Sequence, residues 1–255
     1  MQKGFSLVEL SIVLVILGLL TGGILAGQSL IRASELRAIT TEFQRYQAAT
    51  HTFRDKYFAL PGDMANATAF WLKDNAACAA HTGTAGTPGT CNGNGSGSLQ
   101  YPTALSTTGE TVQFWRHLSL AGLIEGNYTG LAGPVAGADS VIGTNVPRSR
   151  LNNAGWGTAS DPANPGSADT YAYNYGNNFR FGAQNPGFQP STAILTPSEA
   201  WNIDTKMDDG MPGQGKVFAR FWSTCANSTT LSDYTGTYRL DQTGILCSLF
   251  FLHAY

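Results

Sequence analysis

A long apolar stretch near the N-terminus limits the fold of this 255-residue chain more than any other feature. No charged residue occurs between Leu10 and Ile31. At helical rise this stretch spans roughly 33 Å, enough to cross a hydrocarbon core of about 30 Å. One acid, Glu9, stands at its start, and a carboxylate in hydrocarbon is costly unless it has a function. The stretch therefore predicts a membrane-spanning helix with a functional acid near its N-terminal end.

The residues around Glu9 carry a resemblance to a known family. A short basic stub ends at Gly4, and Phe5 opens the run F-S-L-V-E-L-S-I-V-L-V. This pattern resembles the N-terminus of type IV prepilins and type II secretion pseudopilins. In that family a dedicated peptidase cuts after the Gly, methylates the new terminal Phe and leaves a Glu at the fifth mature position. The resemblance therefore implies cleavage between Gly4 and Phe5, and a role in assembly for Glu9.

Two simpler interpretations of the same segment are an ordinary cleaved signal and a plain membrane anchor. A secretory signal has 7–15 apolar residues followed by a small-x-small cleavage site. Here the apolar stretch is longer, Glu9 interrupts its start, and Ile24-Leu25-Ala26 matches such a site poorly. A plain anchor leaves Glu9 without a purpose. The prepilin-type interpretation accounts for all of these features.

The resemblance implies a structural subunit that polymerises and is not an enzyme. In the family, the Glu at the position of Glu9 pairs with the cationic N-terminal amine of a neighbouring subunit, and a paired charge costs less in low dielectric than an isolated one. The implied partners are other pilin or pseudopilin subunits, the prepilin peptidase and an inner-membrane assembly platform. The implied location is the inner membrane, crossed once, with the C-terminal domain outside the cytoplasm. Secretion pseudopilus, surface pilus and DNA-uptake filament all remain open.

The helix is expected to continue beyond the membrane. Apolar and aromatic residues recur at spacings of three and four, which places them on one helical face: Leu36, Ile39, Phe43, Tyr46, Thr50, Phe53 and Tyr57. Charged residues, Glu42 among them, are expected on the other faces. Pro61 should end the helix. We therefore expect an α+β, pilin-like fold in which this stripe packs on an antiparallel β-sheet with long loops.

The expected organisation has four segments. Residues 1–4 form a leader peptide, 5–31 the transmembrane helix, 32–58 its amphipathic continuation, and 59–255 an extracytoplasmic globular domain. The formal net charge of −2, with 13% charged residues, gives no electrostatic reason to expect a nucleic-acid partner.

Further elements are expected within the globular domain. A short helix should cover Glu110 to Ile124, and a second should begin at the cap Thr196, followed by Pro197 and Glu199, and run to about Lys206. Little regular structure is indicated over residues 126–190, except for a half-exposed strand at 171–176. Terminal strands are expected at 216–222 and 238–251.

All four cysteines lie on the exported side of the anchor, and an even number there favours disulfides. Three pairings are open, and the nearest-neighbour set, Cys78–Cys91 and Cys225–Cys247, is the one we expect. Metal binding is the rival, but the sequence has no C-x-x-C.

Three carboxylates near the second of the expected helices form the best candidate metal site. Asp204, Asp208 and Asp209 precede Gly210 at a helix-to-strand turn and could converge on calcium, which prefers oxygen ligands. The alternative is that these residues only form the turn. No other cofactor is expected.

Two G-x-x-x-G matches, Gly18 to Gly22 and Gly23 to Gly27, lie in the anchor. They would let helices approach closely, although Gly is common in membrane helices.

The rival function is a membrane-tethered extracytoplasmic binding module or enzyme that uses a pilin-like anchor. Such a protein requires a pocket with clustered titratable residues. The four histidines are scattered along the sequence, so no such cluster is evident.

Overall fold

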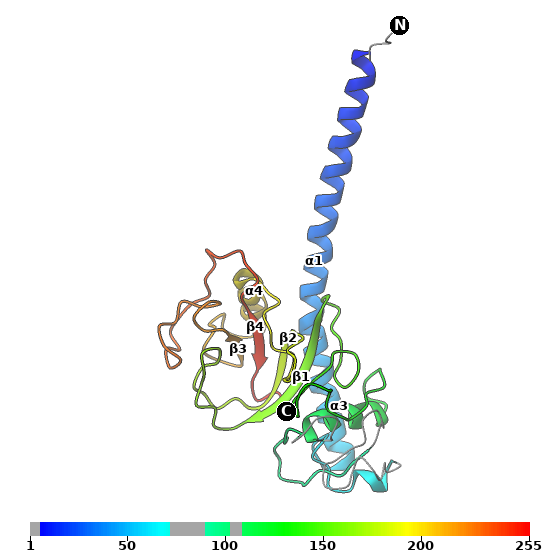
Figure 1. The fold of residues 1–255 in the computed structure, drawn as a ribbon, viewed down its shortest axis with the longest axis vertical. Helices are drawn as coiled ribbons and strands as arrows, with labels where there is room; N and C mark the ends of the chain where they lie inside the picture. The colour runs from blue at the N-terminus through cyan, green and yellow to red at the C-terminus, as the bar shows by residue number, and fades with distance from the viewer. Residues whose placement is uncertain (1–5, 72–89, 103–108) are drawn as a thin grey trace.

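One helix, α1 (Leu7–Tyr57), forms the spine of the molecule. The structure is a computed structural model that describes residues 6–71, 90–102 and 109–255. At helical rise α1 is about 76 Å long, and its N-terminal half stands clear of the rest of the chain (Figure 1). The helix ends at Phe58, which has φ 52° and donates its N–H to the carbonyl of Arg54. The expected continuous helix through both segments is confirmed.

The globular part contains an antiparallel sheet of four strands in the order β1-β2-β4-β3. The strands are β1 (Ala154–Asp161), β2 (Gly176–Ala183), β3 (Val217–Arg220) and β4 (Ser248–Phe251). Trp156 lies opposite Phe181 in the first pair, and Phe179 lies opposite Phe251 in the second. Together, the long apolar helix and this sheet give the expected α+β, pilin-like arrangement.

Two helices flank the sheet. Helix α3 (Glu110–Leu120) lies beside the C-terminal half of α1, and α4 (Pro197–Met207) lies at the end of the domain nearer the exposed half of α1 (Figure 1). A 3-10 turn, η1 (Ala67–Ala69), follows α1. Helix α4 begins as expected: Thr196 and Glu199 form a capping box, with Pro197 in the first turn. Helix α3 ends earlier than expected, since Ala121 caps it before the turn at Gly122, which has φ +72°.

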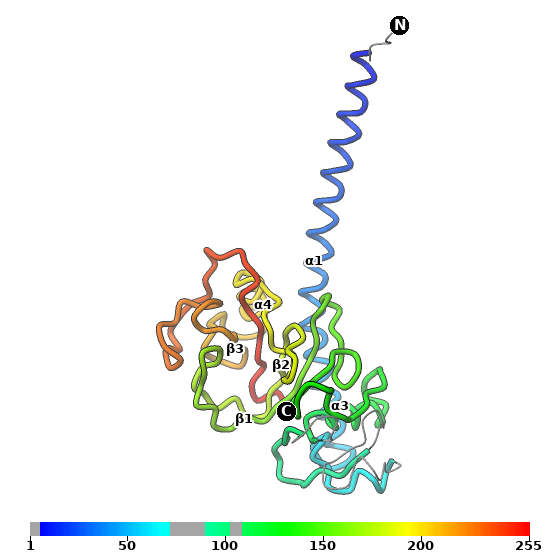
Figure 2. Tube along the Cα trace, viewed as in Figure 1, coloured from blue at the N-terminus to red at the C-terminus, as the bar shows by residue number. Residues whose placement is uncertain are grey.

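The expected strands at 171–176 and 238–251 are mostly wrong. Tyr171 and Tyr175 are buried in a small cluster with Phe218, so the alternation of aromatic residues belongs to a packed loop, and β2 begins only at Gly176. Tyr238 forms one isolated bridge with Ala226, and β4 covers only the last four residues of the second segment. Figure 2 traces the winding path of this part of the chain around α4 and β3.

Aromatic rings join the C-terminal half of α1 to the sheet. The ring of Phe43 stacks on Phe251 with 4.7 Å between centroids, and Tyr46 makes edge contacts with Trp115 and Trp156. Such pairs contribute about 0.5–1.5 kcal/mol beyond the area they bury. The apolar stripe of α1 therefore packs within its own chain, as its aromatic content indicated.

His117 on α3 is buried where α3 approaches the end of α1. Its Nδ1 accepts the N–H of Gly62 at 2.9 Å, and Nε2 lies 3.2 Å from the carbonyl oxygen of Cys91, to which it donates. Burial lowers the pKa of His117 to about 4, so the ring is neutral near pH 7. This histidine has a structural role.

Candidate functional site: the exposed half of the N-terminal helix

The N-terminal half of α1 is an apolar rod that the rest of the chain does not cover. Its large apolar side chains from Leu7 to Ile31 are all at least half exposed, from 50% at Ile16 to 85% at Leu7. The most apolar 18-residue window has a mean hydropathy of 2.4, and none of it is buried. Soluble proteins rarely expose a continuous apolar surface of this size, which marks a membrane or protein contact. The length and composition fit a single-pass membrane anchor.

The start of this rod is closed by a capping box formed by Ser6 and Glu9. The Ser6 side chain accepts the Glu9 N–H at 3.2 Å, and Glu9 Oε2 accepts the Ser6 N–H at 2.8 Å. Glu9 therefore fixes the first turn of its own helix, a local role that sequence reasoning had not assigned. Its Oε1 accepts no hydrogen bond from the described residues. Gly4 and Phe5 lie outside the described residues.

Within the part of the chain that the structure describes, nothing packs against the four glycines of the anchor. A Cβ atom added at Gly18, Gly22, Gly23 or Gly27 would meet nothing within 4 Å. The helix also continues unbroken through Gly22 and Gly23. Close approach of a second helix at these glycines stays a prediction.

An ion pair joins α1 to the globular domain immediately after the last apolar turn of the rod. Arg32 is the first charged residue after the apolar stretch, and its Nε lies 2.6 Å from Glu199 Oε1 at the start of α4. A second contact joins Arg32 to Glu35 at 3.4 Å. Although partial burial raises the pKa of Glu199, the hydrogen bonds from Arg32 and from the Thr196 N–H hold it below its usual value. Helix α4 is therefore held at the level where the apolar stretch ends.

About two turns beyond Glu35, in the packed half of α1, Glu42 is buried and not on a solvent face, contrary to expectation. Its Oε2 accepts from Ser149 Oγ and from Trp156 Nε1, each at 2.7 Å, and its Oε1 accepts from the Arg150 N–H at 2.8 Å. Only 8% of the residue is exposed. Three donors satisfy the carboxylate, so Glu42 fastens the helix to β1 and to the loop before it.

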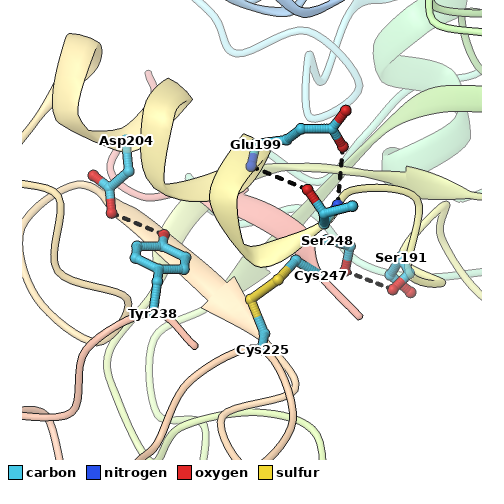
Figure 3. Close-up of a disulfide and its surroundings, with 8 residues drawn as sticks. Ser191, Glu199, Asp204, Cys225, Tyr238, Cys247 and Ser248 are labelled. Atoms are coloured by element: carbon cyan, nitrogen blue, oxygen red, sulfur yellow. Dashed lines mark hydrogen bonds between the residues drawn. A yellow bond between two sulfur atoms is a disulfide. The ribbon is translucent and has the colours of Figure 1, made fainter. Parts of the chain in front are cut away.

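The cysteines near the C-terminus form one of the two expected disulfides. Cys225, in the loop after β3, is bonded to Cys247, directly before β4, with Cα atoms 5.1 Å apart (Figure 3). The backbone of Cys247 also bonds that of Leu195, next to the start of α4. The other expected disulfide includes Cys78, which lies outside the described residues.

The three candidate calcium ligands do come together. Asp204, Asp208 and Asp209 each offer a carboxylate oxygen, and these oxygens lie within 4.8 Å of one another. Asp204 is buried and accepts the Tyr238 hydroxyl at 2.8 Å (Figure 3). Burial, together with the charges of Asp209 and Asp208, raises the pKa of Asp204 to about 7. A cation would relieve this repulsion, so the donor set fits calcium.

The same carboxylates also shape the turn. Asp209 Oδ1 accepts the Met211 N–H at 2.8 Å, and Asp208 Oδ2 accepts the Lys216 and Val217 N–H groups, the latter at 3.2 Å. A Cβ atom at Gly215, which has φ +69°, would collide with Asp208. Both expectations for this segment, metal site and turn, therefore remain compatible with its geometry.

Comparison with known proteins agrees with the geometry of the helix. Residues 1–25 match the family model of the prokaryotic N-terminal methylation motif. No curated protein and no solved structure matches the chain. The matched residues contain the basic stub, Gly4, Phe5, Glu9 and most of the exposed apolar rod. The chain thus carries, at its N-terminus, the prepilin-type cleavage and methylation segment of type IV pilins and pseudopilins.

Proposed function

We propose that this protein is a structural subunit of a type IV pilus-like or type II secretion pseudopilus filament, and that it assembles through α1. The observation that carries the proposal is the uncovered apolar half of α1, which begins with the methylation motif and Glu9. A helix of this kind is stable in a bilayer and also in a bundle of identical helices. Transfer from one to the other gives a filament core without refolding the globular domain.

The chemistry of assembly follows from the first residues. Cleavage after Gly4 leaves Phe5 with a new N-terminal amine, one helical turn from Glu9. Glu9 Oε1, which accepts no hydrogen bond from residues 6–71, 90–102 or 109–255, would accept from the amine of a neighbouring subunit, while Oε2 keeps the capping bond to Ser6. Charge pairing in low dielectric fixes the axial register of the two helices.

The first test of this proposal is the mass of the mature chain. Intact-mass analysis of protein extracted from membranes should give a chain that begins at N-methylated Phe5. A Gly4→Leu variant, which removes the small residue before the cleaved bond, should keep residues 1–4, whereas Gln2→Ala should be processed normally. A mature chain that begins near Gln28, or that keeps Met1, would contradict the proposal.

The exported domain is proposed to lie outside the cytoplasm. The Cys225–Cys247 disulfide supports this placement, because disulfides persist in oxidising compartments. A DNA-uptake or adhesion filament would use the same helix.

We also propose that Asp204, Asp208 and Asp209 hold a calcium ion. The support is the convergence of three carboxylates, one of which, the buried Asp204, has a raised pKa. The ion would stabilise the turn between α4 and β3 without taking part in a reaction. Stabilisation of the fold by calcium, dependent on these side chains, is the expected consequence.

The rival proposal is a membrane-tethered binding module or enzyme. A polar cavity of about 1010 Å³ lies at the far end of α1, lined by His51, Asp55 and Asp63 among others. Asp63 already accepts the N–H groups of Ser96 and Gly97, so it serves the local loop. A processed chain that stays in the membrane and never enters filaments would favour this rival.

A further inference from the structure

A groove between α1 and α4 lies immediately beyond the membrane segment. It has a volume of about 530 Å³. The described residues that line it belong to these two helices: Ala33, Leu36, Arg37, Thr40, Thr41, Asn202, Ile203 and Lys206. The Arg32–Glu199 ion pair holds the two helices together at the upper end of this groove. Figure 1 shows α4 at the end of the domain that faces the exposed half of α1.

The position of the groove matches the headgroup layer of a bilayer. If Ile31 ends the hydrocarbon segment, residues 33 to 41 lie from about 3 to about 15 Å beyond it. The polar layer of each leaflet is about 5–7 Å thick. Side chains on a helix lean toward its N-terminus, so Arg37 on α1 points back toward the bilayer. The upper part of the groove therefore borders the lipid headgroups.

The chemistry of the groove fits an anionic lipid. Arg37 and Lys206 are both exposed, and neither takes part in an ion pair among the described residues, whereas the lining contains no acid. Leu36 and Ile203 give the groove an apolar floor, and Thr40, Thr41 and Asn202 add polar groups. A phosphate would contact the two cations, and the first part of an acyl chain or the glycerol would cover the floor.

A second copy of the chain is a poorer match. Its apolar rod, Leu10–Ile31, has no charge to offer Arg37 or Lys206, and its Glu9 lies at the opposite end of the membrane segment. We therefore propose that this groove binds the headgroup of an anionic phospholipid in the leaflet next to the globular domain. The lipid would hold the unassembled subunit at a fixed depth and orientation. The inference rests on the placement of α1 across the membrane that the proposed function includes.

Native mass spectrometry of the full chain in detergent tests this inference. The probes are phosphatidylglycerol and phosphatidylcholine with the same acyl chains. The test variant is Arg37→Gln/Lys206→Gln, and the control, Arg150→Gln/Lys216→Gln, makes the same change of charge at exposed residues outside the groove. Each cation near an anionic lipid surface changes binding about fivefold, so the test variant, which lacks two, should bind phosphatidylglycerol about 25-fold more weakly. The control should bind as wild type does, and all three should bind phosphatidylcholine equally.

Several outcomes would overturn the inference. Equal binding of phosphatidylglycerol by wild type and test variant would do so, as would an equal loss in the control. Displacement of the lipid by millimolar glycerol phosphate would assign the groove to a soluble anion instead. If the test variant bound lipid as wild type does but no longer cross-linked to neighbouring subunits, the groove would instead be a contact site for a second copy of the chain.

Flotation of the wild-type chain with liposomes separates this inference from the proposed function. A chain that floats but shows no preference for phosphatidylglycerol contradicts the lipid site alone. A chain that does not float contradicts the membrane placement of α1, on which both depend.

Discussion

Replacing Glu42 with Ala should destabilise the protein more than any other single change of an acid on α1. The substitution removes the acceptor for Ser149 Oγ, the Arg150 N–H and Trp156 Nε1. Trp156 is fully buried and Ser149 nearly so, which means that water cannot replace the lost bonds without opening the contact between α1 and β1.

The size of the effect follows from these three bonds. A hydrogen bond to a charged group contributes about 1.5–3 kcal/mol, and a buried donor left unpaired costs about 1–3 kcal/mol. The bonds share one carboxylate and are not additive, and loss of a buried charge offsets part of the cost. We expect the free energy of unfolding to fall by about 3–5 kcal/mol, which lowers Tm by about 6–20 °C for a chain of this size.

Thermal unfolding of the full chain in detergent, followed by near-ultraviolet circular dichroism, measures this change. Glu125→Ala is the matched control, because Glu125 is exposed and should shift stability by no more than about 0.5 kcal/mol. In Glu42→Gln the side-chain oxygen still accepts a hydrogen bond, but the side-chain NH2 group faces a donor that the carboxylate had accepted. Its Tm should therefore lie between those of wild type and Glu42→Ala. A Glu42→Ala protein with the Tm of the control would refute the role given to Glu42.

Three further predictions concern the globular domain. Because burial lowers the pKa of His117 to about 4, below its unfolded value, the contribution of this residue to stability should be complete above about pH 6.5 and fall by about 3 kcal/mol toward pH 4. The raised pKa of Asp204 acts in the opposite sense over the same range, so the measurement is the difference in unfolding free energy between wild type and His117→Asn, which should shrink as the pH falls. Replacing Cys225 and Cys247 with Ser opens a loop with a sequence separation of 22 and should lower stability by about 3 kcal/mol; an unchanged denaturation midpoint would contradict this. Calcium should raise the Tm of wild type, and Asp208→Asn/Asp209→Asn should abolish that increment; no response of the wild type to calcium would leave these residues as turn formers only.

The elements that the sequence predicted well are those specified by local signals. Helix α1 has an apolar stripe with helical spacing and a Pro61 stop, and α4 has a complete capping box at Thr196. These signals act within a few residues of one another. The rod of exposed apolar side chains was equally clear, because a run without charges needs no tertiary partner to be recognised.

Strand β1 could not be recognised in this way. Its sequence, A-G-W-G-T-A-S-D, has no alternation of apolar and polar residues, because most of the strand is buried on both faces. The strand needs its two glycines because distant loops pack closely against it: a Cβ atom at Gly155 would collide with Ile142, and one at Gly157 with Gln189. Only the folded chain reveals why the strand is rich in small residues.

Glu42 was missed for a similar reason. An acid between apolar positions on a helix is normally solvated, and its partners Ser149 and Trp156 lie more than 100 residues away in the sequence. The aromatic segment at 171–176 predicts a strand because alternation is a strand signal, although in the structure two of its rings, Tyr171 and Tyr175, fill a second small cluster. The local role of Glu9 as partner of Ser6 follows the standard capping pattern and was available from the sequence.

Incorporation of Glu9 variants into filaments is the most direct test of the central claim. Tagged Glu9→Ala and Glu9→Gln subunits, with Glu125→Ala as control, would be expressed beside the wild-type chain and quantified in sheared filaments and in membranes. Glu9→Gln can still cap Ser6 but cannot pair as an anion with a neighbouring amine, so it separates the local role from the assembly role. The account predicts normal membrane retention and a normal disulfide for all variants, with incorporation strongly reduced in both Glu9 variants. Incorporation of Glu9→Gln and Glu9→Ala at the level of the control would contradict it.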